Sequence, residues 1–494
     1  MGQYRLMLSH FLLNLLLNLS NAYANWKRMR FTYWAWAPQR QTKQYKLQAL
    51  FYLDQAIALE PEYFVANNPN DSYPIMKLLF ALTIIFLTSG LQAQTNPYLK
   101  DLSALKTILQ KTPSYKSQIK GKQLALYNDL YDRLVTDTAG NVNSYKYFYN
   151  LAQLIFPLKD NHLAFYQIPD GENFKSQERI EQFITTKEFQ DYPKYAGNLD
   201  SLKSALAAKS LDSVEGIYHY GQFYSVGLFK SSNKEYIGVV LESVVPVWQK
   251  GQVAIHLYEY APNLFKAIYG HPRSKHFMLQ PVEKYQNQAL LNSYFYTSYG
   301  QNIYSKQLAQ FDFVNLPKNG PKFELRHVAD DIQYLTVRTF QANRQNAEKS
   351  TVFLDSIKNS LTAANLILDL RNNEGGSKKM ASKYVQLIRE YTQKGHVFIL
   401  INNGTLSQAE ILTLRLKKFK NTRTLGQTTK GMLSYGSNYG KREKLPSQHF
   451  EIYVTDMKNP AKLLNYEDVG INPDISLDEH SNWIEQAIKI IRKL

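Results

Sequence analysis

The chain has 494 residues and 44% hydrophobic content, enough for two or three domains with substantial cores, and its lack of cysteine excludes disulfides, thiolate metal sites and cysteine nucleophiles. The formal net charge of +17 raises the question of nucleic acid, but the lysines are scattered and no RNP, zinc-finger or helix-turn-helix pattern accompanies them. We therefore expect a basic solvated surface and no nucleic-acid partner, while peripheral association with an anionic envelope surface stays open.

The N-terminal part of the chain differs from the rest. Residues 76–94, MKLLFALTIIFLTSGLQAQ, combine a lysine, a short apolar run and small or polar residues near the end, which is the pattern of a secretory signal peptide. A signal peptide stands at the start of a chain, so we expect translation to begin at Met76 and residues 1–75 to come from an upstream start. A genuine extension with an anchor helix over residues 6–19 is the alternative.

The signal peptide predicts an exported protein, periplasmic or extracellular in a bacterial envelope. The apolar run is too short to predict a membrane span, so we expect no transmembrane domain in the mature chain.

Three regions follow in chain order. Residues 95–165 carry apolar residues at spacings of three and four, as in KQLALYNDLYDRLV, and predict a small helical bundle. Residues 166–211 are mixed and end in a helical stretch. Residues 212–325 are rich in Tyr, Val and Phe with alternating polarity, which predicts a mostly-β middle domain, a barrel or sandwich. It lacks a carboxylate-binding GLGF-like turn, so it is not evidently a PDZ domain.

Residues 326–494 hold the segments that predict chemistry. Residues 366–377, LILDLRNNEGGS, and residues 397–412, VFILINNGTLSQAEIL, are each a branched apolar run that ends in a Gly-rich or Ser/Thr turn. Buried strands of an α/β domain deliver loops to a site in this way. The second turn places Ser407 before a helical pattern, where a hydroxyl can be exposed beside free backbone N–H groups. A serine here can also be a simple helix cap.

Four motifs in this order resemble the C-terminal processing and tricorn-like serine peptidases of family S41. They are DLRNNEGG, GTLSQAE, TLGQTTKG (residues 424–431) and EDVGINPDI (residues 467–475). The resemblance covers residues 332–477 and extends weakly back to His162. It implies an α+β multidomain fold: an N-terminal helical bundle, the β-rich middle domain and a C-terminal α/β catalytic domain of the ClpP/crotonase-like type. The implied activity is hydrolysis of peptide bonds in peptides or unfolded protein.

The resemblance also assigns site residues, one motif at a time. Ser407 matches the nucleophile, which would form an acyl-enzyme. The N–H of Gln408 and one from Gly375 or Gly376 would form the oxyanion hole. No metal and no cofactor are implied, and the His and carboxylate spacing offers no H-E-x-x-H ligand set.

Two general bases are compatible with the family. The Ser/Lys branch carries a lysine after the serine, but Met432 occupies that position and its thioether cannot accept a proton. Lys430 lies two residues away, and we interpret it as a solvated loop lysine. The tricorn-like branch takes a histidine from the end of the helical region and a distant glutamate, which match His162 in LKDNHLAFY and Glu467.

In that branch a polar residue precedes the histidine, and Asn161 stands there as a candidate relay between Glu467 and His162. A catalytically silent module that binds peptides or hydrophobic ligands in the same cleft is the competing function. It would have little reason to keep the whole set of residues.

Overall fold

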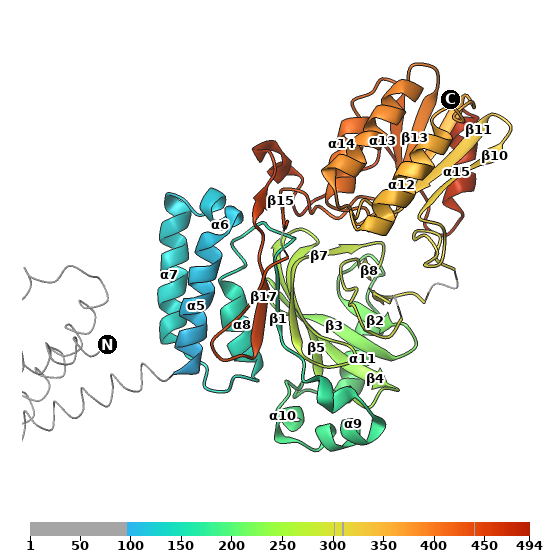
Figure 1. Cartoon of the computed structure of the whole chain (residues 1–494). Coiled ribbons are helices and arrows are strands. Elements are labelled where there is room, and N and C mark those ends of the chain that lie inside the picture. Colours follow the sequence, from blue (N-terminus) through green and yellow to red (C-terminus); the bar gives the residue numbers. More distant parts are fainter. Residues whose placement is uncertain (1–95, 301, 309–310, 439) are drawn as a thin grey trace, which may run out of the picture. The chain divides into compact units, whose positions relative to one another are not determined.

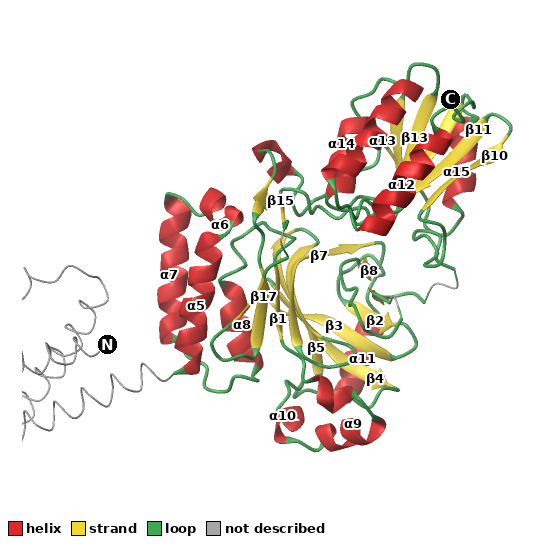
Figure 2. Cartoon of the chain, in the orientation of Figure 1, coloured by secondary structure: helices red, strands yellow, loops and turns green. Residues whose placement is uncertain are grey.

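The structure, a computed structural model, describes residues 96–300, 302–308, 311–438 and 440–494, which belong to one compact unit, Asn96–Leu494 (Figure 1). The predicted signal peptide at residues 76–94 and the predicted extension at residues 1–75 lie outside the described residues. The unit mixes helices and sheets (Figure 2), which confirms the predicted combination of the two.

The described part of the chain begins with a helical segment. Its helices are α5 (Pro97–Lys111), α6 (Pro113–Gln118), α7 (Lys122–Thr136) and α8 (Tyr145–Gln153). The side chains of Asn96, Thr112 and Ser144 cap three of them by accepting backbone N–H bonds. The apolar faces of these helices pack in one core with Phe165 and Phe450, which lie on strands of the neighbouring sheet.

The larger sheet has eleven strands. Nine of them are β1 (Ala164–Gln167), β2 (Gly216–Tyr220), β3 (Tyr224–Ser232), β4 (Glu235–Ser243), β5 (Val253–Ala261), β6 (Leu264–Gly270), β7 (Phe277–Gln286), β8 (Ala289–Leu290) and β9 (Tyr304–Ser305). Because β8 pairs with both β7 and β9, the strands from β2 to β9 form a closed ring of antiparallel pairings. Short helices η3 (Gly171–Phe174), α9 (Gln177–Ile184), α10 (Lys187–Gln190) and α11 (Leu199–Ala207) precede the ring.

The remaining two strands of this sheet come from much later in the chain. They are β16 (Arg442–Lys444) and β17 (Phe450–Tyr453), and β17 pairs with β1. The sheet therefore runs across the predicted boundaries at residues 165 and 325. The alternating burial of β17 depends on its own residues and can be predicted from them. Its pairing partner, β1, lies far away in the sequence, so the sequence pattern could not have assigned β17 to this sheet.

The second sheet is the one that positions the candidate site. It has the order β10 (Phe323–Ala329), β11 (Ile332–Val337), β12 (Asn365–Asp369), β13 (His396–Ile401), β14 (Thr422–Gly426) and β19 (Ile475–Ser476). All neighbours after β10–β11 are parallel. Parallel strands are buried on both faces, which explains the continuous apolar runs of β12 and β13.

Helices cover both faces of the second sheet. Helices α12 (Arg344–Ile357), α13 (Lys378–Tyr391) and α14 (Gln408–Leu416) pack on one face, and α15 (Trp483–Ile491) packs on the other. The remaining short elements are β15 (Tyr435–Gly436), β18 (Met457–Lys458) and η4 (Ala461–Asn465).

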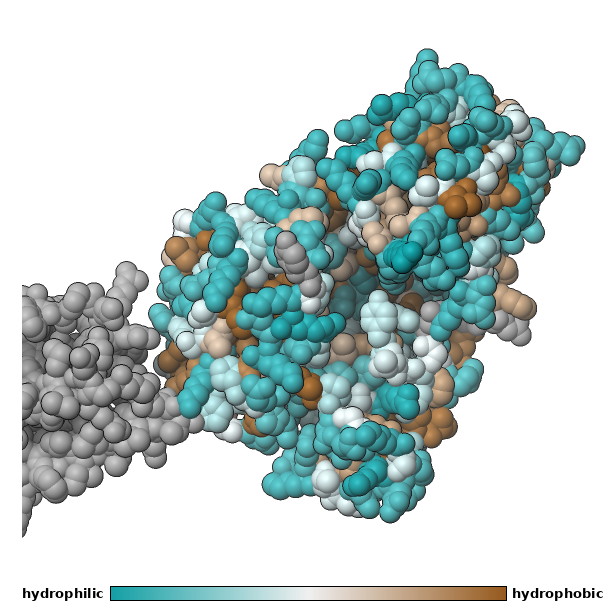
Figure 3. All heavy atoms as spheres, in the orientation of Figure 1, coloured by the Kyte–Doolittle hydropathy of each residue, from teal (hydrophilic) through white to brown (hydrophobic). Residues whose placement is uncertain are grey.

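On the face shown in Figure 3, hydrophobic residues are scattered among hydrophilic ones. Within the described ranges, no helix is both long and apolar enough to cross a membrane.

We expect Ile452→Ala to lower the free energy of unfolding by about 3 kcal/mol, because Ile452 on β17 is fully buried in the core shared with the helical segment. Urea unfolding followed by circular dichroism measures this loss. Lys444→Ala, on the exposed edge of β16, is the control and should change the free energy by less than about 0.5 kcal/mol. Equal midpoints for the two variants would show that β17 does not tie the two segments together.

Candidate active site

Ser407 lies in the turn between β13 and α14, directly before the first helical residue. Its backbone has φ 57° and ψ −121°, in the left-handed half of conformational space that residues with a side chain rarely adopt. Its N–H donates to Glu410 Oε2 (3.0 Å). A strained serine at a strand-to-helix turn, held through its backbone, is the arrangement in which a nucleophilic hydroxyl is exposed.

The structure brings His162 to Ser407 across 245 residues of sequence. His162 follows α8 and the turn at Asp160, and its Nε2 lies 3.0 Å from Ser407 Oγ. Burial lowers the pKa of His162 to about 4, so the imidazole is neutral around neutral pH and can accept a proton. Its Nδ1 is buried without a hydrogen-bond partner.

Glu467 lies close to this pair but does not contact the imidazole. Its carboxylate accepts backbone N–H bonds from Asn161 (2.9 Å), Leu433 (2.9 Å) and Ser434 (2.7 Å). Burial raises the pKa of Glu467 to about 8, and the three N–H donors act in the opposite direction. Glu467 is therefore linked to His162 through the main chain of the preceding residue.

The side chain of Asn161 does not form the predicted relay. Its Nδ2 donates to the carbonyl oxygen of Gly431 (2.6 Å) and to Asp468 Oδ1 (3.2 Å) instead. Its Oδ1 is buried without a partner. The amide therefore fixes the loops around the histidine, and the contact with Glu467 is made by the Asn161 backbone, which a sequence pattern cannot distinguish from a side-chain contact.

The three candidate oxyanion donors differ in the availability of their N–H groups. The Gly375 N–H is already bound to Asn373 Oδ1 (2.9 Å), whereas Gly376 and Gln408 make no such N–H bond. Gly375 has φ 81°, and a Cβ on it would lie 2.7 Å from the nitrogen of Gln408. Glycine is therefore required for the Gly-rich loop to approach the Ser407 turn this closely.

Lys430 is not a solvated loop lysine, and that interpretation was wrong. Its side chain is half-buried, and burial lowers its pKa, opposed by the nearby carboxylates of Glu283, Glu410 and Glu374. Local sequence did not reveal this because the burying residues come from distant segments. Met432, at the lysine position of the Ser/Lys branch, contributes a backbone N–H to Glu410 Oε2 (2.9 Å).

The sequence profile of peptidase family S41 matches residues 378–477, which include Ser407, Lys430 and Glu467. This chain carries a domain of peptidase family S41. The S41 domain makes the protein a serine-type peptidase. A comparison with curated proteins found no match.

Solved structures similar to this chain include three proteases. The photosystem II D1 C-terminal processing protease is 15% identical, with 78% of this chain and 94% of that chain covered and a TM-score of 0.32. Mature CPAF is 12% identical, with 81% and 96% covered and a TM-score of 0.36. The tricorn protease is 12% identical, with 80% and 37% covered and a TM-score of 0.31. At such identities and TM-scores, these structures support no inference about individual residues.

Within the S41 domain, Glu410 is a residue that sequence reasoning missed. Its buried carboxylate accepts four hydrogen bonds, from Ser407 N–H (3.0 Å), Thr429 Oγ1 (2.6 Å), Gly431 N–H (2.8 Å) and Met432 N–H (2.9 Å). The S-x-x-E spacing from Ser407 to Glu410 is that of a capping box and could have identified it.

Lys284 on β7 was also missed, and no sequence signal marks it. Its buried ammonium donates to the carbonyl oxygens of Thr429 (2.9 Å) and Val469 (3.2 Å). Burial lowers its pKa to about 8. Lys284 thereby connects the large sheet to both loops that surround the S41 site.

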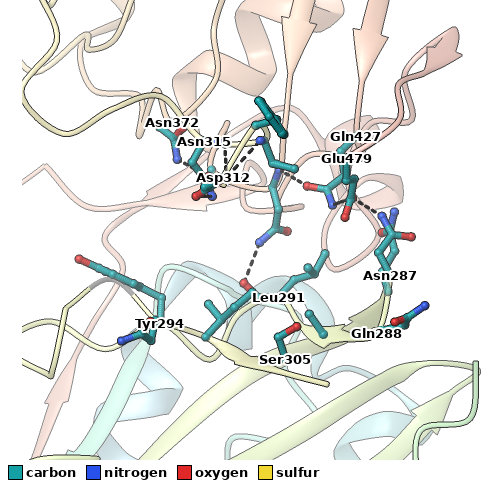
Figure 4. A pocket seen from close by; sticks show the side chains of 18 of the residues that line it. Asn287, Gln288, Leu291, Tyr294, Ser305, Asp312, Asn315, Asn372, Gln427 and Glu479 are labelled. Atoms are coloured by element: carbon teal, nitrogen blue, oxygen red, sulfur yellow. Dashed lines mark hydrogen bonds between the residues drawn. The ribbon is translucent and has the colours of Figure 1, made fainter. Parts of the chain in front are cut away.

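A cleft of about 1150 Å³ adjoins the S41 site. Its lining includes Leu406, directly before Ser407, and Glu374, directly before Gly375. Asn287 and Gln427 both donate to Glu479 at one side of it (Figure 4). Among the described residues, no group of three or more His, Asp or Glu side chains could hold a metal ion.

We expect Glu410→Gln to destabilise the protein by about 3 kcal/mol. The carboxylate accepts hydrogen bonds from four donors, and the amide NH2 of glutamine would face some of these donors with donors of its own. Urea unfolding measures the change. Glu348→Gln, in an exposed pair with Arg344, is the matched control and should be within about 0.5 kcal/mol of wild type. A loss no larger than in this control would contradict the role given to Glu410.

Proposed function

We propose that the protein is an exported S41 peptidase of the tricorn-like branch, with Ser407 as nucleophile, His162 as general base and Glu467 in support. The observation that carries the proposal is the 3.0 Å contact between His162 Nε2 and Ser407 Oγ, made by a neutral histidine and a serine in a strained turn. Peptides or unfolded protein segments are the proposed substrates. The ClpP/crotonase-like type of the C-terminal α/β domain belongs to the same proposal.

Acylation begins when Ser407 Oγ attacks the scissile carbonyl carbon and its proton passes to His162 Nε2. The negative charge that develops on the carbonyl oxygen is stabilised by the N–H groups of Gln408 and Gly376, because both are uncommitted. When the C–N bond breaks, His162 returns the proton to the leaving amine. Water then attacks the acyl-enzyme through the same base and releases the acid.

Glu467 supports the base indirectly in this proposal. Its carboxylate holds the backbone N–H of Asn161, which fixes the position of the adjacent His162. Its oxygens also place negative partial charge near the imidazole when the imidazolium forms. A lysine base is disfavoured because Met432 occupies the expected position and Lys430 makes no contact with Ser407 among the hydrogen bonds of the described residues.

We expect a fluorophosphonate serine probe to label the wild-type protein, and Ser407→Ala to lose labelling completely. His162→Ala should slow labelling by about a thousandfold or more, because the serine loses its base. Lys430→Met serves as the matched control and should change the rate by less than about tenfold. The reverse ranking of His162→Ala and Lys430→Met would restore the Ser/Lys mechanism.

The same experiment separates the peptidase from the catalytically silent binding module. A well-folded wild-type protein that takes up no probe would favour the binding module.

The pH dependence of kcat/KM should reflect the buried histidine. The neutral imidazole is the active form, and its lowered pKa means that activity persists below the usual histidine range and disappears as the pH falls through about 4. Initial rates on a peptide substrate, with folding checked by fluorescence at each pH, measure this loss of activity at acidic pH. Glu467→Gln should retain the same acidic midpoint, since the midpoint reflects protonation of His162. A midpoint at the ordinary histidine value would contradict the buried, neutral base.

Export and its signal sequence are a separate part of the proposal. Expressed in a bacterial host, the mature protein should begin near Gln94 or Thr95, because signal cleavage follows the small residue Ala93. N-terminal sequencing of the protein from the periplasm or medium measures this. Mature protein that retains Met1 would overturn the predicted signal peptide.

A further inference from the structure

Exposed aromatic and aliphatic side chains gather on the cleft beside Ser407. Tyr294, Tyr296, Leu308 and Phe311 all line it, and they are 37%, 69%, 48% and 70% exposed. Tyr294 and Tyr296 form an edge-to-face pair with ring centroids 5.4 Å apart. Isolated exposed apolar residues need no explanation, whereas a cluster on one concave surface is typical of a binding site.

The backbone of Tyr296 is held in place although its ring is exposed. Its carbonyl oxygen accepts from the Thr297 hydroxyl (2.6 Å) and lies 3.1 Å from His271 Nε2. His271 Nδ1 accepts the N–H groups of Arg273 and Ser274, both at 3.2 Å, so the proton of the neutral ring must be on Nε2. His271 therefore donates to Tyr296.

The turn after Tyr296 is strained. Thr297 has φ 62°, which is unfavourable for a β-branched residue. Such strain persists where the surrounding contacts fix the conformation, and it is common at ligand-binding positions. An exposed ring on a fixed, strained backbone is thus pre-organised for contact with a ligand.

Tyr296 contacts a residue that adjoins the candidate oxyanion loop. Its hydroxyl donates to Glu374 Oε1 at 3.5 Å, and Glu374 directly precedes the Gly375–Gly376 loop. The cleft also reaches Leu406, the neighbour of Ser407. A chain bound across Ser407 would therefore extend along the Tyr296 ring.

Several polar side chains that line the cleft are bonded to one another or to neighbouring residues. Gln427 Nε2 donates to Glu479 (2.8 Å), as does Asn287 Nδ2, and Asn403 Nδ2 donates to Asn292 Oδ1 (2.9 Å) and Leu291 O (3.1 Å). Figure 4 shows Asn287 and Glu479 turned toward each other. The exposed aromatic faces add an apolar surface to this polar lining.

We propose that Tyr296, paired with Tyr294, is a specificity-determining residue that binds a large apolar side chain of the polypeptide substrate. This inference rests on the proposed function for its substrate. The ring offers a flat, solvent-exposed apolar face to an aromatic or branched aliphatic side chain, and its fixed backbone lowers the entropic cost of ordering it.

Binding is measured on the full chain carrying Ser407→Ala, so that the result does not depend on turnover. Fluorescence anisotropy compares two labelled peptides, identical except that one carries a single Phe where the other carries Ser. The Phe peptide should bind about tenfold more tightly than the Ser peptide, Tyr296→Ala should remove this preference, and Tyr296→Phe should retain it. Val352→Ala, equally exposed on α12 but outside the cleft, is the matched control and should leave it unchanged.

The outcomes distinguish failure of the proposed role of Tyr296 from failure of the proposed peptidase mechanism. Equal preference in Tyr296→Ala and its parent would overturn the role of Tyr296. Competition by N-acetylglucosamine oligomers, without any peptide preference, would assign the rings to carbohydrate and would also overturn it. In the chain with Ser407 intact, Val352→Ala should label with the fluorophosphonate at the wild-type rate. Absence of labelling in this variant and in the wild type would reject the peptidase mechanism alone, because the anisotropy result stands independently.

Discussion

The arrangement of the S41 site depends on one buried carboxylate. Glu410 accepts the N–H of Ser407 and, on its two oxygens together, three donors from the loop Thr429–Met432. Its burial raises its pKa, and the donors around it favour the charged form. Because a buried carboxylate is tolerated only when its lone pairs are satisfied, the strained Ser407 turn and this loop must form together.

The loop Thr429–Met432 passes that constraint to the other candidate residues. The carbonyl of Gly431 accepts both the Asn161 amide and the Asp468 N–H (3.0 Å), so it contacts the neighbours of His162 and of Glu467. A Cβ on Gly470 would lie 2.2 Å from the Thr429 oxygen, so these loops touch backbone to backbone. The loop Thr429–Met432 thus contacts segments that are far apart in sequence and fixes their positions relative to one another.

What the sequence predicted and what it missed follow from the range of the interactions. The apolar run of β13, the turn at Ser407 and the helix after it are local, and their pattern predicted a strand delivering a serine. The burial of Lys430, the connection made by Lys284 and the pairing of β17 with β1 depend on distant partners. For Asn161, the sequence predicted a side-chain relay between Glu467 and His162, whereas its backbone N–H contacts Glu467 and its side chain contacts Gly431.

Burial also sets the charge of the site before any substrate binds. It lowers the pKa of His162 to about 4 and raises that of Glu467 to about 8, so both groups favour their neutral forms around neutral pH. In the proposed reaction, proton transfer from Ser407 creates an imidazolium, and the oxygens of Glu467, held through the Asn161 backbone, place negative partial charge near it. This favours the imidazolium of the transition state over the neutral imidazole of the resting enzyme, which is the condition for an electrostatic contribution to rate rather than to binding.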